Sequence, residues 1–140
     1  MNTFKSSLAF VICLLLGMQS AQAQMRYGET LCNLPEYFCM KIKSGDNWDR
    51  LFPNIEEQDI VRRINRMNIR LKPGMIIAVP KNIERLTIYD VSPFPRYIEP
   101  SGEKTIYVSQ KKLAWGAYDE DGELLWWGPI SSGVGKCKVI

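Results

Sequence analysis

Closely spaced residues that interrupt helices and strands limit the middle of this 140-residue sequence to short secondary-structure elements. Between positions 40 and 80 these interruptions fall at residues 44–46 (Ser-Gly-Asp), at Pro53 and at residues 71–74 (Leu-Lys-Pro-Gly). Glycine favours tight turns, and proline ends helices because it lacks an N–H donor. Residues 75–79 then form an apolar run typical of a strand. This stretch therefore predicts a small βααβ unit.

The first strand and the first helix are predicted on either side of the Ser-Gly-Asp break. Residues 40–43 alternate apolar and basic side chains, as a half-buried strand does. Asp46 or Asn47 is a candidate N-cap for a helix that ends at Pro53. Trp48 lies on the same side of this helix as the apolar residues that follow it, so we expect Trp48 to be in the core.

A second helix is predicted directly after the first. Asn54 and Glu57 have the spacing of a capping box at its start. Its acidic residues lie in the first turn and its basic residues lie late, which suits the helix macrodipole. Its buried stripe, at helical spacing, consists of Ile60, Val61, Ile64 and Met67.

A run of basic residues follows the start of this helix, at Arg62, Arg63, Arg66, Arg70 and Lys72. The formal net charge of the whole chain is only +3, which gives little attraction to nucleic acid or to an anionic surface. We therefore expect the basic run to be a solvated helix face, with contact to a polyanion as the less favoured alternative.

The N-terminal 23 residues have the pattern of a secretory signal peptide. Lys5 precedes an apolar stretch at residues 8–18, and residues 21–23 (Ala-Gln-Ala) form a cleavage motif before Gln24. The apolar stretch is about half of the roughly 20 residues that a bilayer-spanning helix needs. We therefore expect an exported protein with no membrane attachment after cleavage.

Three cysteines follow the leader: Cys32, Cys39 and Cys137. Exported proteins meet an oxidising environment, in which thiols pair. Cys32 and Cys39 flank a turn-like stretch and are predicted to form a disulfide in segment 24–39. Metal binding is the alternative, but the spacing is not C-x-x-C and the chain has no histidine. Cys137 is left without an intramolecular partner.

The absence of histidine excludes several chemistries for this chain taken alone. These are Ser-His-Asp catalysis, Cys-His catalysis and zinc sites with histidine ligands. We expect no cofactor, no metal site and no nucleic-acid partner.

Residues 81–103 are predicted to be a linker because they are rich in proline. Within them, residues 83–89 are a candidate strand. Antiparallel strands are predicted after the linker at 105–108, 113–118 and 124–127.

A turn at residues 119–122 joins the last two predicted strands, with Gly122 at the position that tolerates a positive φ. Counting back from this turn places Trp115 opposite Trp127, with Trp126 on the other face of the sheet. A one-residue change of loop register would exchange the two roles.

Residues 40–80 resemble a LysM domain, because the Ser-Gly-Asp and Lys-Pro-Gly signals occur in the same order around two helices. That family has a βααβ fold and binds glycans that contain N-acetylglucosamine, such as peptidoglycan and chitin. Asn47 and Trp48 stand where the family commonly has threonine and leucine. The resemblance implies glycan contacts at two loops, formed by Gly45, Asp46, Asn47 and Trp48 on one side and by Ile69, Arg70 and Leu71 on the other.

Residues 104–140 resemble the first strands of YkuD-type L,D-transpeptidases. The similarity lies in Thr-Ile-Tyr-Val-Ser-Gln at 105–110, Tyr-Asp-Glu-Asp-Gly-Glu at 118–123 and Pro-Ile-Ser-Ser-Gly at 129–133. Those enzymes cross-link peptidoglycan stem peptides through a catalytic cysteine in a Ser/Thr-His-Gly-Cys motif. The chain lacks that motif, and Cys137 does not stand in it, so the resemblance implies no catalytic residue here.

Together these patterns predict an α+β chain divided at 1–23, 24–39, 40–80, 81–103 and 104–140. We expect a protein of the periplasm or cell envelope whose partner is peptidoglycan, with a non-catalytic transpeptidase-like segment. The alternative is the front part of an active L,D-transpeptidase whose catalytic half is not in this sequence.

Overall fold

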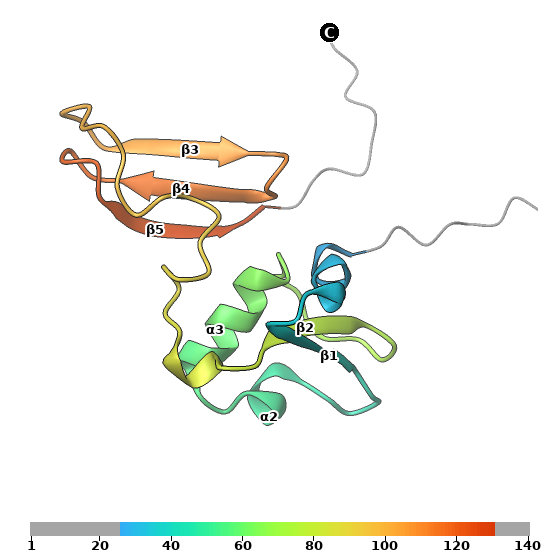
Figure 1. The fold of residues 1–140 in the computed structure, drawn as a ribbon. Coiled ribbons are helices and arrows are strands. Elements are labelled where there is room, and N and C mark those ends of the chain that lie inside the picture. The colour runs from blue at the N-terminus through green and yellow to red at the C-terminus, as the bar shows by residue number, and fades with distance from the viewer. Residues whose placement is uncertain (1–25, 131–140) are drawn as a thin grey trace, which may run out of the picture.

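The structure, a computed structural model, describes residues 26–130 and has an α+β fold. Helices and strands are short and follow one another closely (Figure 1). In chain order they are η1 (Tyr27–Asn33), β1 (Tyr37–Lys41), α2 (Trp48–Leu51), α3 (Ile55–Ile64), β2 (Ile76–Pro80), η2 (Ile83–Arg85), β3 (Thr105–Ser109), β4 (Ala114–Tyr118) and β5 (Leu124–Pro129). The predicted fold class is therefore confirmed.

The first half of the fold is the predicted βααβ unit. Strands β1 and β2 pair antiparallel, from Tyr37 opposite Pro80 to Lys41 opposite Ile76, and α2 and α3 lie between them in sequence. Apolar side chains from all four elements and their loops meet in one core. Its buried members are Ile42, Trp48, Phe52, Val61, Met67, Met75, Ile77 and Val79.

Strand β1 lies earlier in the chain than residues 40–43, so that predicted position is wrong. The ladder starts at Tyr37, and Lys81 N–H donates to the Glu36 carbonyl just beyond it. Strand β1 thus includes residues 37–39, which also pair with β2. The apolar-basic alternation at residues 40–43 did not indicate this earlier part of the strand. Ile42 follows the strand and is fully buried, with its N–H bonded to the Met75 carbonyl.

Asparagine side chains cap both helices, as the sequence predicts. Asn47 Oδ1 accepts the Arg50 N–H at 2.9 Å, and Asn54 Oδ1 accepts the Glu56 N–H at 2.9 Å. Of the two candidates for the first cap, Asn47 fills the position, and Asp46 instead accepts the Lys43 N–H at 2.8 Å. Each cap satisfies helix donors that have no partner within the helix.

The second half is a three-stranded antiparallel sheet in the order β3–β4–β5. The predicted pairing of Trp115 with Trp127 is wrong: Trp127 lies opposite Gly116, and Trp115 lies opposite Gly128. The register shifts between Ala117 and Tyr118, because β5 contains one extra residue there. As a result Trp127 is buried, whereas Trp126 is 47% exposed.

Residues 83–89 do not form a strand, so that prediction is also wrong. Residues 83–85 are the 3₁₀ helix η2, and a turn follows in which the Asp90 carboxylate accepts the N–H and the hydroxyl of Thr87, both at 2.7 Å. These side-chain bonds compete with an extended backbone. Hydrogen bonding by Thr87 lowers the pKa of Asp90.

The proline-rich segment after η2 packs on the sheet. Val91, Phe94 and Ile98 cover a second core made of Ala114, Tyr118, Leu124 and Trp127. The segment also forms backbone bonds to β5, since Leu124 N–H donates to the Arg96 carbonyl at 2.8 Å. This segment therefore completes the second core.

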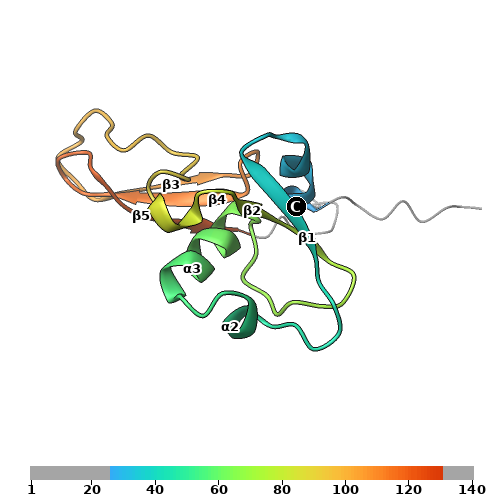
Figure 2. The same ribbon diagram turned by 60° about the horizontal axis from the view of Figure 1, so that its bottom comes forward.

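Helix α3 contacts the edge strand β5, and both views place the two elements next to each other (Figure 1, Figure 2). The Arg63 guanidinium lies 4.2 Å from the Trp126 ring centroid and 5.4 Å from that of Trp127. Arg66 donates to the Lys112 carbonyl at 2.8 Å. The prediction of a solvated arginine face is therefore wrong for Arg63, which is 4% exposed, and for the half-buried Arg66.

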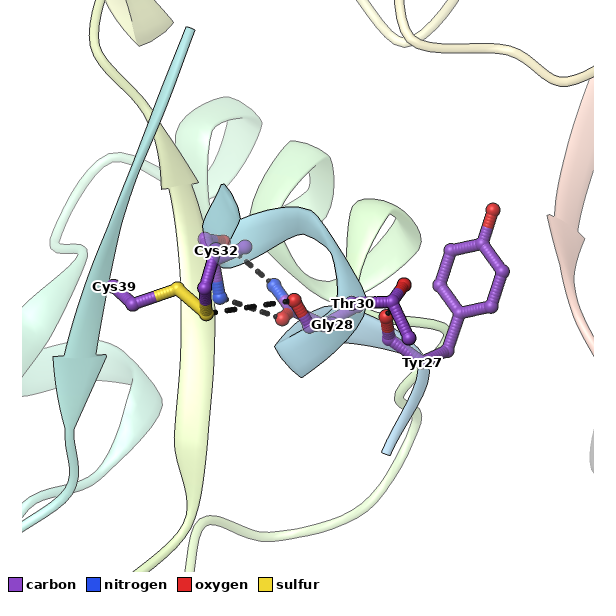
Figure 3. The surroundings of a disulfide bond; sticks show 7 residues. Tyr27, Gly28, Thr30, Cys32 and Cys39 are labelled. Carbon is purple, nitrogen blue, oxygen red and sulfur yellow. Dashed lines mark hydrogen bonds between the residues drawn. A yellow bond between two sulfur atoms is a disulfide. The ribbon is translucent and has the colours of Figure 1, made fainter. Parts of the chain in front are cut away.

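The predicted disulfide between Cys32 and Cys39 is present and links η1 to β1 (Figure 3). Next to it, Gly28 lies so close to Asn65 that an added Cβ would stand 1.8 Å from the amide oxygen.

The signal peptide and Cys137 lie outside the described residues. Within residues 26–130 no helix has the length and apolar character needed to cross a membrane.

Candidate functional site

A cleft of about 400 Å³ lies where the start of α2, the middle of α3 and the loop before β2 meet. It is lined by Asn47, Trp48, Asp49, Gln58, Arg62, Arg70 and Leu71. Its wall therefore combines amide groups, both signs of charge and apolar surface. A concave surface on which several polar groups converge is a candidate binding site.

Trp48 fixes the two loops of the cleft relative to each other. Its indole N–H donates to the Ile69 carbonyl at 2.9 Å, across 21 positions of sequence. The rest of the Trp48 ring is in the core, as predicted, and the residue is 5% exposed. Because a buried indole needs a hydrogen-bond partner, this bond ties the loop before β2 to the start of α2.

Four of the seven residues named from the sequence line this cleft together: Asn47, Trp48, Arg70 and Leu71. Ile69 contributes the carbonyl that Trp48 bonds. The structure thus brings the first loop and the loop before β2 to a single cleft.

Gly45 and Asp46 are not among the lining residues. Gly45 has a φ of +87°, which glycine adopts without strain, and it forms the turn that leads into α2. Asp46 closes the same turn through its bond to the Lys43 N–H. Both residues shape the loop without facing the cleft.

Gln58 is a cleft residue that the sequence analysis did not single out. It is 4% exposed, and its amide donates to Asp49 Oδ1 at 3.0 Å and to the Phe52 carbonyl at 3.3 Å. These bonds connect α2 to α3 beneath the cleft. A signal was present in the sequence, because Gln58 lies three positions before Val61 and so on the apolar side of α3.

Arg62 is a second cleft residue that went unrecognised. Its guanidinium lies 5.1 Å from the Trp48 ring centroid, within cation–π range. It also lines a neighbouring cavity of about 290 Å³ together with Ile55, Glu56, Gln58 and Asp59. Gln58 and Arg62 therefore form the ridge that the two hollows share.

The lining of the cleft carries hydrogen-bonding and charged groups that can bind a polar ligand. The two cysteines within residues 26–130 are joined to each other, so this part of the chain offers no thiol nucleophile. The same part contains no group of three side chains able to hold a metal ion. No family model, curated protein or solved structure matches the chain.

Proposed function

We propose that the protein binds a glycan containing N-acetylglucosamine, as found in peptidoglycan, in the cleft between the 45–48 loop and the 69–71 loop. The observation that carries the proposal is that Asn47, Arg70 and Leu71, taken from two separate motifs of the sequence, line one cleft. The βααβ order with antiparallel β1 and β2 also agrees with the LysM resemblance.

The surface of the cleft suits an N-acetylated sugar. An acetamido group offers one N–H donor and one carbonyl acceptor, and the sugar hydroxyls both donate and accept. Asn47 contributes an amide of matching polarity, and Arg70 adds donors at the exposed side. Leu71, which packs partly against the core, supplies apolar surface for the sugar ring.

Trp48 acts here as a positioning residue. With so little of its ring exposed, it offers no open face for stacking a sugar. Its role is to hold the Ile69 carbonyl and to support the Arg62 guanidinium. The large side chain of Trp48 thus contributes to the shape of the cleft without contacting the sugar through an open face.

We further propose that the protein acts in the periplasm or cell envelope, where peptidoglycan is found. The predicted signal peptide supports this location. The Cys32–Cys39 disulfide supports it independently, because such bonds persist in oxidising compartments.

A second candidate function is that of the front part of an L,D-transpeptidase encoded in a longer reading frame. The observation that favours it is the exposed apolar surface of β3, at Ile106, Tyr107 and Val108, which further strands of a larger domain would cover. Sequencing the DNA beyond codon 140 tests it. A continuing frame with a Ser-His-Gly-Cys motif supports this function, and an immediate stop codon contradicts it.

Retention on purified peptidoglycan sacculi tests the binding function. We expect the parent protein to sediment with sacculi, and Arg70→Ala to sediment about fivefold less because a charged hydrogen-bond donor is lost from the cleft. Arg85→Ala is the matched control, since Arg85 has an 83% exposed side chain and lies outside the cleft. Absence of parent protein from the sacculus pellet contradicts the proposal.

A further inference from the structure

Arg62 lies between the cleft and the neighbouring cavity, and its guanidinium packs against the core residue Trp48. It lines both the cleft and the neighbouring cavity, and its guanidinium rests on the buried Trp48 ring. A cation fixed in this way loses little conformational freedom when a ligand binds. Arg62 is therefore pre-organised at the centre of the surface that a glycan would cover.

In the part of the chain that the structure describes, the positive charge of Arg62 is not paired with an acidic side chain. Within residues 26–130 neither Arg62 nor Arg70 forms a salt bridge. The Nε atom of Arg62 is buried and has no hydrogen-bond partner among the described residues. Because the protein covers the Nε atom, the terminal guanidinium nitrogens of Arg62 are the donors left for an anionic group of a ligand.

The acidic side chains near Arg62 already have other partners. Asp49 accepts the Gln58 amide at 3.0 Å, and Asp59 forms a salt bridge with Arg63 at 2.9 Å. Glu56 lies in the first turn of α3, where the helix dipole favours a negative charge. Of these three acids only Asp59 is paired with a cation, so Asp49 keeps its negative charge at the cleft, where Arg62 and Arg70 outnumber it and leave the lining with a net positive charge.

Arg63 and Arg66 do not extend this positive surface, and the exposed Lys72 is not among the residues that line the cleft. Arg63 is covered by Trp126, and Arg66 is bonded to the Lys112 carbonyl and to the Tyr27 hydroxyl. A long polyanion needs a row of accessible charges. Two arginines at one cleft fit a single small anionic group instead.

We propose that the cleft selects N-acetylated glycans that carry a carboxylate, with Arg62 as the main contact for that carboxylate and Arg70 as the second. This inference rests on the proposed function. Guanidinium groups bind carboxylates through two parallel N–H···O bonds. In peptidoglycan the carboxylate comes from the lactyl group of muramic acid or from an attached peptide, whereas an oligomer of N-acetylglucosamine has none.

Isothermal titration of the purified protein with three ligands tests the selectivity. The ligands are a neutral N-acetylglucosamine oligomer, a muramic-acid-containing oligomer of the same length with free lactyl carboxylates, and the same oligomer with peptides attached. We expect both acidic ligands to bind about tenfold more tightly than the neutral one at low salt, and the difference to shrink as salt is added. Whichever acidic ligand binds more tightly identifies the source of the carboxylate.

Variants at Arg62 separate charge from shape. We expect Arg62→Gln to weaken the acidic ligands about tenfold more than it weakens the neutral oligomer. Arg62→Lys keeps the charge and should retain part of the preference. Arg85→Gln is the matched control, and thermal unfolding of each variant shows that the fold is intact.

The outcomes distinguish this inference from the proposed function. Equal binding of neutral and acidic ligands, or an equal loss of both in Arg62→Gln, overturns the selectivity and leaves glycan binding standing. If none of the three ligands binds to the parent protein, the proposed function fails and the selectivity fails with it.

Discussion

Individual residues late in α3 have roles that their type alone does not reveal. Asn65 is 2% exposed, and its amide donates to the Ala78 carbonyl at 2.7 Å and accepts the Ala78 N–H at 2.8 Å. A third bond joins its amide to the Val61 carbonyl at 2.8 Å. Asn65 thus pairs with the backbone of β2 as a neighbouring strand would.

We expect Asn65→Ala to lower the free energy of unfolding by about 3 kcal/mol, because the buried Ala78 N–H and carbonyl lose their partner. Urea denaturation followed by circular dichroism measures the change. The exposed Asn68 provides the matched control, and Asn68→Ala should leave the unfolding midpoint in place. A loss below about 1 kcal/mol in Asn65→Ala contradicts the role given to this side chain.

Arg66 connects three parts of the molecule. Its guanidinium reaches the Lys112 carbonyl before β4, the Arg63 carbonyl in α3 and the Tyr27 hydroxyl in η1. Its φ of +55° is unusual for a residue with a Cβ, so the contacts hold a backbone conformation that costs energy. Because the surrounding protein covers much of the guanidinium, burial lowers the pKa of Arg66.

Tyr118 makes stability depend on pH in alkaline solution. Its hydroxyl donates to the Pro95 carbonyl at 2.8 Å, and burial, followed by the neighbouring Tyr107, raises its pKa above the usual 10.0. Above about pH 10 the unfolded chain loses this proton while the folded protein keeps it, so the free energy of unfolding falls as pH rises. Below that pH the tyrosine contributes no pH dependence, because both states are protonated.

We expect Tyr118→Phe to reduce this alkaline fall, and the raised pKa of the partly buried Tyr37 accounts for a share that remains. Urea midpoints measured between about pH 8 and 11 give the slope. A variant whose stability falls as steeply as that of the parent contradicts the burial of this hydroxyl.

At the scale of elements, the α3–β5 contact links the two halves of the fold, in addition to the segment after η2. Arg63 is positioned by Asp59, one turn earlier in the helix, and lies over the Trp126 ring. Arg66 reaches Trp127 on the same strand, with its guanidinium 5.2 Å from that ring centroid. The contact therefore pairs cations with aromatic rings, in contrast to the core of the βααβ unit, whose buried members are all uncharged.

A double-mutant cycle between α3 and β5 measures this contact. We expect Arg63→Met and Trp126→Ala to show a coupling free energy of about 1 kcal/mol in urea denaturation, as a partly desolvated cation–π pair should. A matched cycle with Leu125→Ala, on the same strand, should give additive effects, because Leu125 has no aromatic ring with which the Arg63 guanidinium could pair. Additivity in the first cycle contradicts the pairing.

Helix caps and turns could be predicted from the sequence, because each depends on residues next to it in the chain. The caps at Asn47 and Asn54 and the turns with Gly74 and Gly122 depend on neighbouring residues, and the structure confirms them. The position of β1 could not be predicted in this way. It depends on pairing with β2, some forty positions later, and pairing between distant segments leaves no local pattern.

The same limit explains the register of the sheet and the burial of the arginines. The extra residue in β5 moves Trp127 opposite Gly116, and nothing in the turn sequence encodes it. Arg63 has the spacing of the buried stripe, but its charge indicated a solvated position, and only the later chain at Trp126 covers it. Of the candidate site, both loops could be placed from motifs, whereas Gln58 and Arg62 join it through helix packing.

At the scale of the whole molecule, a small βααβ unit with a polar cleft is joined to a three-stranded sheet through α3 and the segment after η2. The disulfide adds η1 to the first unit (Figure 3). The cleft lies at the α2 side of α3, and the cation–π contact with Trp126 uses a different residue of the same helix. Binding and assembly thus use separate side chains of α3.

The most direct test of the central claim is an amide NMR titration with a soluble muramic-acid-containing fragment of peptidoglycan. If the cleft binds the glycan, the largest chemical-shift changes will occur at residues 45–48 and 69–71, with further changes at Gln58 and Arg62. The amides of β3 should keep their positions. Saturable shifts confined to the β3–β5 sheet, or no shifts at any ligand concentration, would contradict the claim.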